Sequence, residues 1–563
     1  MKPVNAGRTL FWTLALFCAV VSCADVKPTI SPERFQQTVQ GPGAYRFESP
    51  RAEAVQTLAR QGATWSPAEI EAVSASFREL PRNEVCRGDL LELKFGLQHW
   101  RIKGRTALQQ KLLAARSASE ALEALRGLNR LASVNAAPEL IAVGKKLTSF
   151  PDQRDELLAG FAELVVLQGD SEKTREVQDE LPQGFRPTLP LYADGPELVP
   201  DIPASRESSW PFERILSTPA LSHYLRDADG RVRYRGMSFK PGDLLFVNLT
   251  NPSEGLFTSF VSEENYAYHL ALYVELEKDG LKFPCVYESY EHGTRIVPLV
   301  TYLNPRHTLY VEVYRFREFP KESDARLGAA VLETLPLPHG FNIYIHAEKS
   351  AGGRYITCTT AVTQVLRQVG FAFPDFRTQI QPGVQKNLAN IGILASEMQT
   401  PSDFLLLADQ VSIVGWHDNL NWKRHLASTL TTRYLTRLLE TRNLDPGDDG
   451  VVGVYRFGTR AIQQDTFLLG GLLRWTFGFT KNTFPTGPTD ALAFILRLEE
   501  KMDSAVEKVE GDLRRNNAFY ESTPWFSVHG AFSDPQLASL VADRFSVSNN
   551  WFKLIPQDPA APR

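Results

Sequence analysis

The segment 269–290, HLALYVELEKDGLKFPCVYESY, constrains the fold more than any other part of the chain. Two runs rich in aliphatic, aromatic and β-branched residues flank Asp279-Gly280, a dipeptide typical of two-residue hairpin turns. If the neighbours of this dipeptide close the turn, residue 269 pairs with residue 290. The segment therefore predicts an antiparallel hairpin with a defined register.

This register places a histidine and a carboxylate on the same face of the hairpin. Side chains alternate between faces along a strand, so His269 points away from the aliphatic face formed by Leu270, Leu272 and Val274. Glu288 is then the diagonal neighbour of His269 on the opposite strand, close enough for a hydrogen bond. A register shift of one residue would send the two side chains to opposite faces.

A cysteine stands at the start of a predicted helix in the segment YITCTTAV, residues 355–362. An apolar stripe predicts a helix over 357–369, ended by Gly370. Unpaired amide N–H groups and the positive end of the helix dipole favour a thiolate at Cys358. The simpler interpretation is a small residue that packs the helix start. With a histidine base and an orienting carboxylate, the same cysteine would be a nucleophile.

The N-terminal segment has the pattern of an export signal. Lys2 and Arg8 precede an apolar run from 10 to 21, which is too short to span a bilayer comfortably. We expect residues 1–22 to be a signal peptide, and the end of the run resembles a bacterial lipobox with Cys23 as the lipidated residue. Cleavage after Ala24 is the alternative. In both cases the mature protein leaves the cytoplasm, and the lipobox predicts a lipoprotein of the bacterial periplasm or cell envelope.

Besides Cys18 and Cys23 of the export segment, the chain has three cysteines, Cys86, Cys285 and Cys358. An exported protein with three cysteines can form one disulfide and keeps at least one thiol unpaired within the chain. Cys86–Cys285 is one pairing that this count allows, and the sequence does not establish it.

Composition along the chain predicts several regions. We expect a helical domain over 45–181, a Pro-rich linker over 182–211, a β-rich domain over 212–415 and a C-terminal helical region over 416–563. The apolar stretch 467–479 has 13 residues and contains Arg474, so a buried helix or a membrane-surface contact is favoured over a membrane span. The formal net charge of −4 argues against a nucleic-acid-binding protein.

Four motifs occur in the order seen in a known family: GDLLF (242–246), YHLALYV (268–274), YES (287–289) and YITCTTAVTQVL (355–366). This order resembles the permuted NlpC/P60 cysteine hydrolases of the YiiX/YebB-like group, in which the histidine strand precedes the cysteine helix. The resemblance implies an α+β fold: a permuted papain-like core with an antiparallel sheet and a cysteine-bearing helix, here with helical flanks. It implies Cys358 as nucleophile, His269 as general base and Glu288 as third member.

The same resemblance gives Tyr355 and Thr357 as candidates for contacting the substrate or its oxyanion, because Tyr355 matches an aromatic position before the family's cysteine. Where the family often has Cys-Ser-Glu-Leu, this chain has Cys358-Thr359-Thr360-Ala361, a difference that bears on substrate preference.

The expected function is an exported cysteine hydrolase that cleaves an amide or ester bond through an acyl-enzyme. Its substrate would be a peptide or acyl-containing component of the envelope, with cell-wall peptides implied by family and location. The alternatives are a lipid acyltransferase or thioesterase of the permuted type, and a non-catalytic envelope scaffold. We expect no cofactor, and four further histidines of the β-rich region, His292, His307, His339 and His346, lack metal-ligand spacing.

Overall fold

The computed structural model describes most of the chain between residues 45 and 556. The described residues are 45–60, 66–82, 85–131, 135–166, 171–183, 212–262, 264, 266–290, 293–304, 307–319, 323–335, 340–341, 355–371, 377–407, 410–419, 422–445, 450–463, 472, 489–515, 528–532, 535, 539, 541 and 553–556. The predicted signal peptide and Cys23 lie outside them. So do 184–211 of the predicted linker and all of the stretch 467–479 except Leu472.

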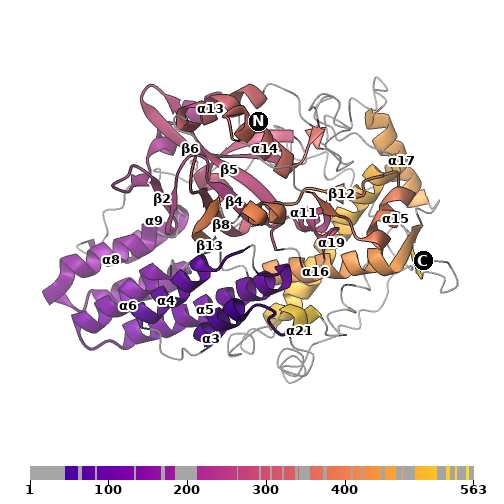
Figure 1. Ribbon diagram of the computed structural model, residues 1–563. Coiled ribbons are helices and arrows are strands. Elements are labelled where there is room, and N and C mark those ends of the chain that lie inside the picture. Colours follow the sequence, from indigo (N-terminus) through magenta and orange to yellow (C-terminus); the bar gives the residue numbers. More distant parts are fainter. Residues whose placement is uncertain are drawn as a thin grey trace.

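The N-terminal region is helical, as the sequence predicted. Its helices are α3 (Pro50–Arg60), α4 (Pro67–Glu79), α5 (Arg87–Ala114), α6 (Ala118–Arg130), α7 (Ala137–Leu147), α8 (Arg154–Val166) and α9 (Ser171–Glu180). Local sequence sets several of their starts. Ser66 and Glu69 form a capping box at α4, and the Ser117 side chain caps α6 by accepting a hydrogen bond from Glu120 N. These helices form the bundle at the lower left of Figure 1.

The centre of the molecule is a six-stranded antiparallel sheet with strand order β13-β8-β4-β5-β6-β7. Its strands are β4 (Leu244–Leu249), β5 (His269–Lys278), β6 (Leu281–Tyr290), β7 (Gly293–Pro298), β8 (Thr308–Phe316) and β13 (Val411–Asp418). Two of them, β5 and β6, lie where the sequence predicted a hairpin. The fold is thus α+β with an antiparallel sheet.

The predicted hairpin between β5 and β6 is confirmed, including its register. Lys278 pairs with Leu281, and the ladder continues to Leu272 opposite Tyr287. Asp279 and Gly280 have φ values of 53° and 76°, the left-handed conformation that a two-residue hairpin turn of this type requires. The turn chemistry therefore fixes which residues of β5 and β6 share a face.

One face of the sheet, the face of His269, is covered by a small antiparallel sheet. This sheet comprises β1 (Leu225–Arg226), β2 (Val232–Tyr234) and β3 (Met237–Phe239). The Phe239 ring lies 5.3 Å from the ring of Tyr273, which shares a face with His269. The histidine face is therefore an interior surface.

The opposite face carries Leu272 and Tyr287 and is covered by helices. Thr334 Oγ1, at the end of α13 (Ser323–Thr334), donates a 3.2 Å hydrogen bond to Tyr287 Oη. Arg82 Nε, in the loop after α4, donates a 3.1 Å hydrogen bond to Tyr314 Oη. The central sheet is thus enclosed on both sides.

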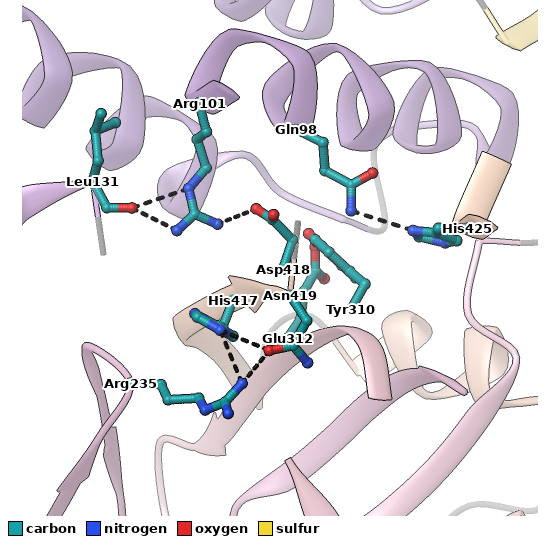
Figure 2. A network of polar contacts seen from close by, with 10 residues as sticks. All are labelled: Gln98, Arg101, Leu131, Arg235, Tyr310, Glu312, His417, Asp418, Asn419 and His425. Carbon is teal, nitrogen blue, oxygen red and sulfur yellow. Dashed lines mark hydrogen bonds and ion pairs between the residues drawn. The ribbon is translucent and has the colours of Figure 1, made fainter. Parts of the chain in front are cut away.

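Helix α5, one of the N-terminal helices, contacts both the central sheet and the C-terminal helix α16. Polar side chains along it bond Asn248 on β4, Asp418 on β13 and His425 on α16 (Trp422–Thr441); Figure 2 shows the last two contacts. The buried apolar residues of the N-terminal helices and of the sheet form one continuous cluster. The helical region expected at the N-terminus therefore shares its core with the sheet.

The C-terminal region has a second hydrophobic cluster, to which α5 also contributes Leu91, Phe95 and Ile102. The helices that form this cluster or lie next to it are α11 (Pro252–Ser259), α15 (Pro382–Asn390), α16, α17 (Gly450–Gln463), α19 (Thr489–Arg515) and α21 (Val528–Phe532). The last five lie to the right of the sheet and below it in Figure 1. Among the described residues, no helix is both long enough and apolar enough to cross a membrane.

Candidate active site

His269 and Glu288 are hydrogen-bonded, as the hairpin register predicted. His269 is the first residue of β5, and its Nε2 lies 2.8 Å from Glu288 Oε2 on β6. Both side chains are buried, with 3% and 0% of their surface exposed. A carboxylate in this position selects one tautomer and one orientation of the imidazole.

Arg295 completes the surroundings of Glu288. It lies directly opposite Glu288 on β7, and its Nε donates a 2.6 Å hydrogen bond to Glu288 Oε1. Burial alone would raise the pKa of Glu288, but the Arg295 guanidinium and the hydrogen bond with His269 hold that pKa well below its usual value. The carboxylate is therefore charged at neutral pH.

His307 lies close enough to this group to interact electrostatically with Glu288, Arg295 and His269. Burial lowers the pKa of His307 to about 3, and the Glu288 carboxylate opposes that shift only in part. His307 is thus neutral at physiological pH. From the sequence, His307 was a candidate only for metal binding, and no role was predicted for Arg295. The alternation of side chains between faces, extended to β7, would have placed Arg295 beside Glu288. His307 lies in a loop, where this alternation predicts nothing.

Cys358 is the first residue of α14 (Cys358–Gln368), where the apolar stripe predicted a helix start. Its thiol is free and half-buried. Thr357 caps the helix, because its Oγ1 accepts a hydrogen bond from Thr360 N. In return, Thr357 N donates a 2.7 Å hydrogen bond to Thr360 Oγ1. Thr357 N–H is therefore already bonded. The amides of Cys358 and Thr359 have no hydrogen-bond partner among the described residues and are the donors open to an oxyanion.

Tyr355 lies in β10 (Tyr355–Ile356), which pairs in parallel with β9 (Gly340–Phe341). The short strand leads directly into the capped start of α14. The strand-to-helix junction that the sequence predicted around Cys358 is therefore confirmed at the level of the backbone.

Helix α14 packs against β5 and β6, the two strands that carry His269 and Glu288. Its C-terminal end bonds to α13, since Ser323 Oγ donates a 3.5 Å hydrogen bond to Val369 O. The ring of Phe371, just beyond the helix, lies 4.3 Å from that of Phe316 on β8. Because the register puts Phe316 and Tyr287 on the face opposite His269, these contacts place α13 and the end of α14 on that opposite face.

The structure thus brings together two of the three predicted catalytic side chains. Within the described part of the chain, no hydrogen bond joins Cys358 Sγ to His269 or to Glu288. The histidine and carboxylate belong to the buried group with Arg295 and His307, while the thiol stands at the helix start.

The other two cysteines are free, so the Cys86–Cys285 pairing that the cysteine count allowed is not formed. Cys285 is buried in β6, and burial raises the pKa of its thiol. Cys86 caps α5 and lies 3.3 Å from Tyr45 Oη. Burial raises the pKa of Cys86 as well, which makes it a less reactive thiol.

The described residues contain no group of three or more His, Cys, Asp and Glu side chains that could hold a metal ion. Comparisons with protein-family models, with curated proteins and with solved structures find no match to this chain. Its function is therefore argued from the site.

Proposed function

We propose that the protein is a cysteine hydrolase with Cys358 as its nucleophile and a permuted NlpC/P60-like core. The observation that carries the proposal is a free, half-buried thiol at the first residue of α14, beside two amide N–H groups that have no hydrogen-bond partner among the described residues. A helix start favours the thiolate, and the amides can stabilise the oxyanion of a tetrahedral intermediate.

In the proposed reaction the thiolate attacks the carbonyl carbon of an amide or ester. A C–S bond forms, the C–N or C–O bond breaks, and an imidazolium donates a proton to the leaving group. Water then attacks the thioester and releases the acid and Cys358. His269 is the proposed base, and Glu288 holds its imidazole through the 2.8 Å contact. Because no hydrogen bond joins His269 to Cys358 Sγ among the described residues, this role requires a rearrangement that brings the imidazole and the thiol into contact.

We also propose that the enzyme acts outside the cytoplasm, tethered to a membrane through a lipid on Cys23. The support for this is the basic and apolar N-terminal pattern that ends in Val20-Val21-Ser22-Cys23. Peptides of the cell wall are the proposed substrates, an assignment that rests on resemblance and location. Ester or thioester substrates would indicate the acyltransferase or thioesterase alternative.

A specific observation favours a second candidate function, the non-catalytic scaffold. His269 and Glu288 are buried and bonded to each other, and no described hydrogen bond links them to Cys358. Such a group also serves simply to stabilise a sheet interior. On this reading, the helical regions would bind envelope partners around an inactive core.

Thiol labelling and acyl-enzyme trapping test the proposal. Iodoacetamide at pH 7 should label Cys358 faster than Cys86, a matched control that also stands at a helix start but whose pKa is raised. Cys358→Ala should abolish this labelling and the covalent adduct that mass spectrometry detects with an activated peptide ester. Cys86→Ser should leave both unchanged. Equal labelling of wild type and Cys358→Ala would overturn the nucleophile assignment.

The role of His269 is tested separately. In folded protein, His269→Ala should leave slow alkylation of Cys358 in place but abolish turnover of the peptide substrate. Full turnover by this variant would remove His269 from the mechanism and leave Cys358 with another base. If His269→Ala fails to fold and the wild type turns over neither amide nor ester substrates, these results together would support the scaffold function.

A further inference from the structure

Helix α16 presents polar side chains to the interior along one side. His425, Ser428, Thr429, Thr432 and Thr436 follow the three- and four-residue spacing that places side chains on one face of a helix. All five are at most 1% exposed. A buried helix face usually packs apolar groups, so this face needs hydrogen-bond partners.

Some of these groups find partners on neighbouring elements. Tyr268 Oη donates a 2.9 Å hydrogen bond to Thr429 Oγ1, and the Ser259 and Thr436 hydroxyls lie 2.7 Å apart. His425 Nδ1 lies 3.2 Å from Gln98 Nε2 of α5, a contact visible in Figure 2. These bonds tie α16 to α5, α11 and the start of β5.

Other buried polar atoms between these elements have no hydrogen-bond partner within the described chain. They are Gln98 Oε1, Asn248 Nδ2, His425 Nε2, Ser428 Oγ and Thr432 Oγ1. We call this set of residues on α16, α5 and β4 the polar seam.

Tyr310 on β8 is a common neighbour of two members of the polar seam, Asn248 and His425, and of Lys94. Asn248 pairs with Tyr310 across the sheet, and the His425 ring lies 5.8 Å from the Tyr310 ring. Lys94 Nζ lies 4.9 Å from the same ring and donates a 2.7 Å hydrogen bond to Asn248 Oδ1. Figure 2 shows Tyr310 together with His425.

The chemistry of the seam selects its ligand. It offers a donor at Asn248, an acceptor at Gln98 and hydroxyl groups that both donate and accept. Burial keeps the pKa of His425 well below its usual value, so the imidazole is neutral, and the Lys94 amine already donates to Asn248 Oδ1 and Tyr266 O. An anion would also leave Gln98 Oε1 unbonded. A small neutral molecule that donates and accepts matches every group.

We infer that ordered water molecules occupy the polar seam between α16, α5 and strands β4 and β8. A buried water makes about three hydrogen bonds, so waters in the seam can supply partners for these atoms. Without them, each buried polar group would lose its hydrogen bonds to water on folding without replacement, which destabilises the folded protein. The waters are then structural parts of the contact between the C-terminal helices and the sheet.

Thr432→Val tests this inference because valine keeps the shape of threonine and removes the hydroxyl. If water bonds the hydroxyl, the variant should lower the Tm, by an amount similar to the matched control Thr429→Val, whose hydroxyl bonds Tyr268. If the seam is dry, removing an unbonded hydroxyl raises the Tm, and that result would overturn the inference.

A crystal structure of the wild-type protein gives a second, independent readout. We expect water density within hydrogen-bond distance of His425 Nε2 and Thr432 Oγ1, and its loss at the second position in Thr432→Val. An apolar-packed seam without such density would refute the inference even if the variant failed to fold.

Discussion

Glu288 Oε2 lies 2.8 Å from His269 Nε2 in the interior of the sheet, on the face covered by β1, β2 and β3. The same carboxylate accepts a hydrogen bond from Arg295, so one buried negative charge serves two partners. This relationship links the proposed catalytic base to the stability of the sheet.

Glu288→Gln should destabilise the protein strongly. The amide keeps the size of the side chain but removes the negative charge that pairs with the buried Arg295 guanidinium. Breaking a buried ion pair in this way costs about 3–5 kcal/mol. Urea denaturation at pH 7 measures the change. The control is Glu123→Gln in the exposed pair with Lys111, where a loss of at most about 1 kcal/mol is expected. Equal losses in the two variants would contradict the prediction.

His307 should make the protein sensitive to acid. Its pKa is about 3 in the folded protein and near 6.5 when unfolded, so the unfolded chain binds the proton more readily. The stability contributed by neutral His307 is complete above pH 6.5 and is lost as the pH falls toward 3. Glu288, with its lowered pKa, adds a loss of the same sign below about pH 4.5.

Unfolding midpoints measured from pH 8 to pH 4 check this prediction. His307→Gln should make the decline between pH 6.5 and pH 4.5 less steep, by up to about 1.4 kcal/mol per pH unit, because one histidine no longer contributes. The buried His417 and His425, whose pKa values are also lowered, contribute to the decline in both proteins. A parallel decline in wild type and variant would show that His307 is not the group responsible.

Lys94 should give a pH dependence at the alkaline end. Burial lowers its pKa to about 7, against the attraction of Glu312, so the folded protein favours the neutral amine. Folding therefore gains stability as the pH rises from about 7 toward the unfolded pKa of about 10.5, and this gain is absent below pH 7. Thermal unfolding at pH 7 to 9 should show a rising Tm in the wild type. Lys94→Met should lose that rise, and an unchanged slope would refute the assignment.

Gly280→Val should weaken the hairpin that aligns His269 with Glu288. Gly280 has a φ of 76°, and a branched side chain in the left-handed region costs roughly 1–2 kcal/mol. Asp279→Asn is the matched control, because asparagine tolerates that conformation. Urea midpoints compare the two variants, and equal stability of both would show that the turn does not limit the register.

The sequence alone determined the parts of the site that depend on local structure. Asp279-Gly280 favours one turn type, and that turn fixes the β5–β6 register and hence the pairing of His269 with Glu288. The apolar stripe after Thr357 likewise determined that Cys358 begins a helix. Both inferences need only the chain's local periodicity and turn chemistry.

Tertiary structure decided the remaining relationships. The positions of Arg295 and His307 depend on a third strand and a loop that meet the hairpin across the sheet. The face on which α14 lies depends on its packing with α13 and Phe316, contacts between residues distant in sequence. A periodic pattern tells which side of an element is buried but not which surface covers it. For that reason the sequence predicted the three proposed catalytic residues but not that, among the described residues, no hydrogen bond joins Cys358 to His269.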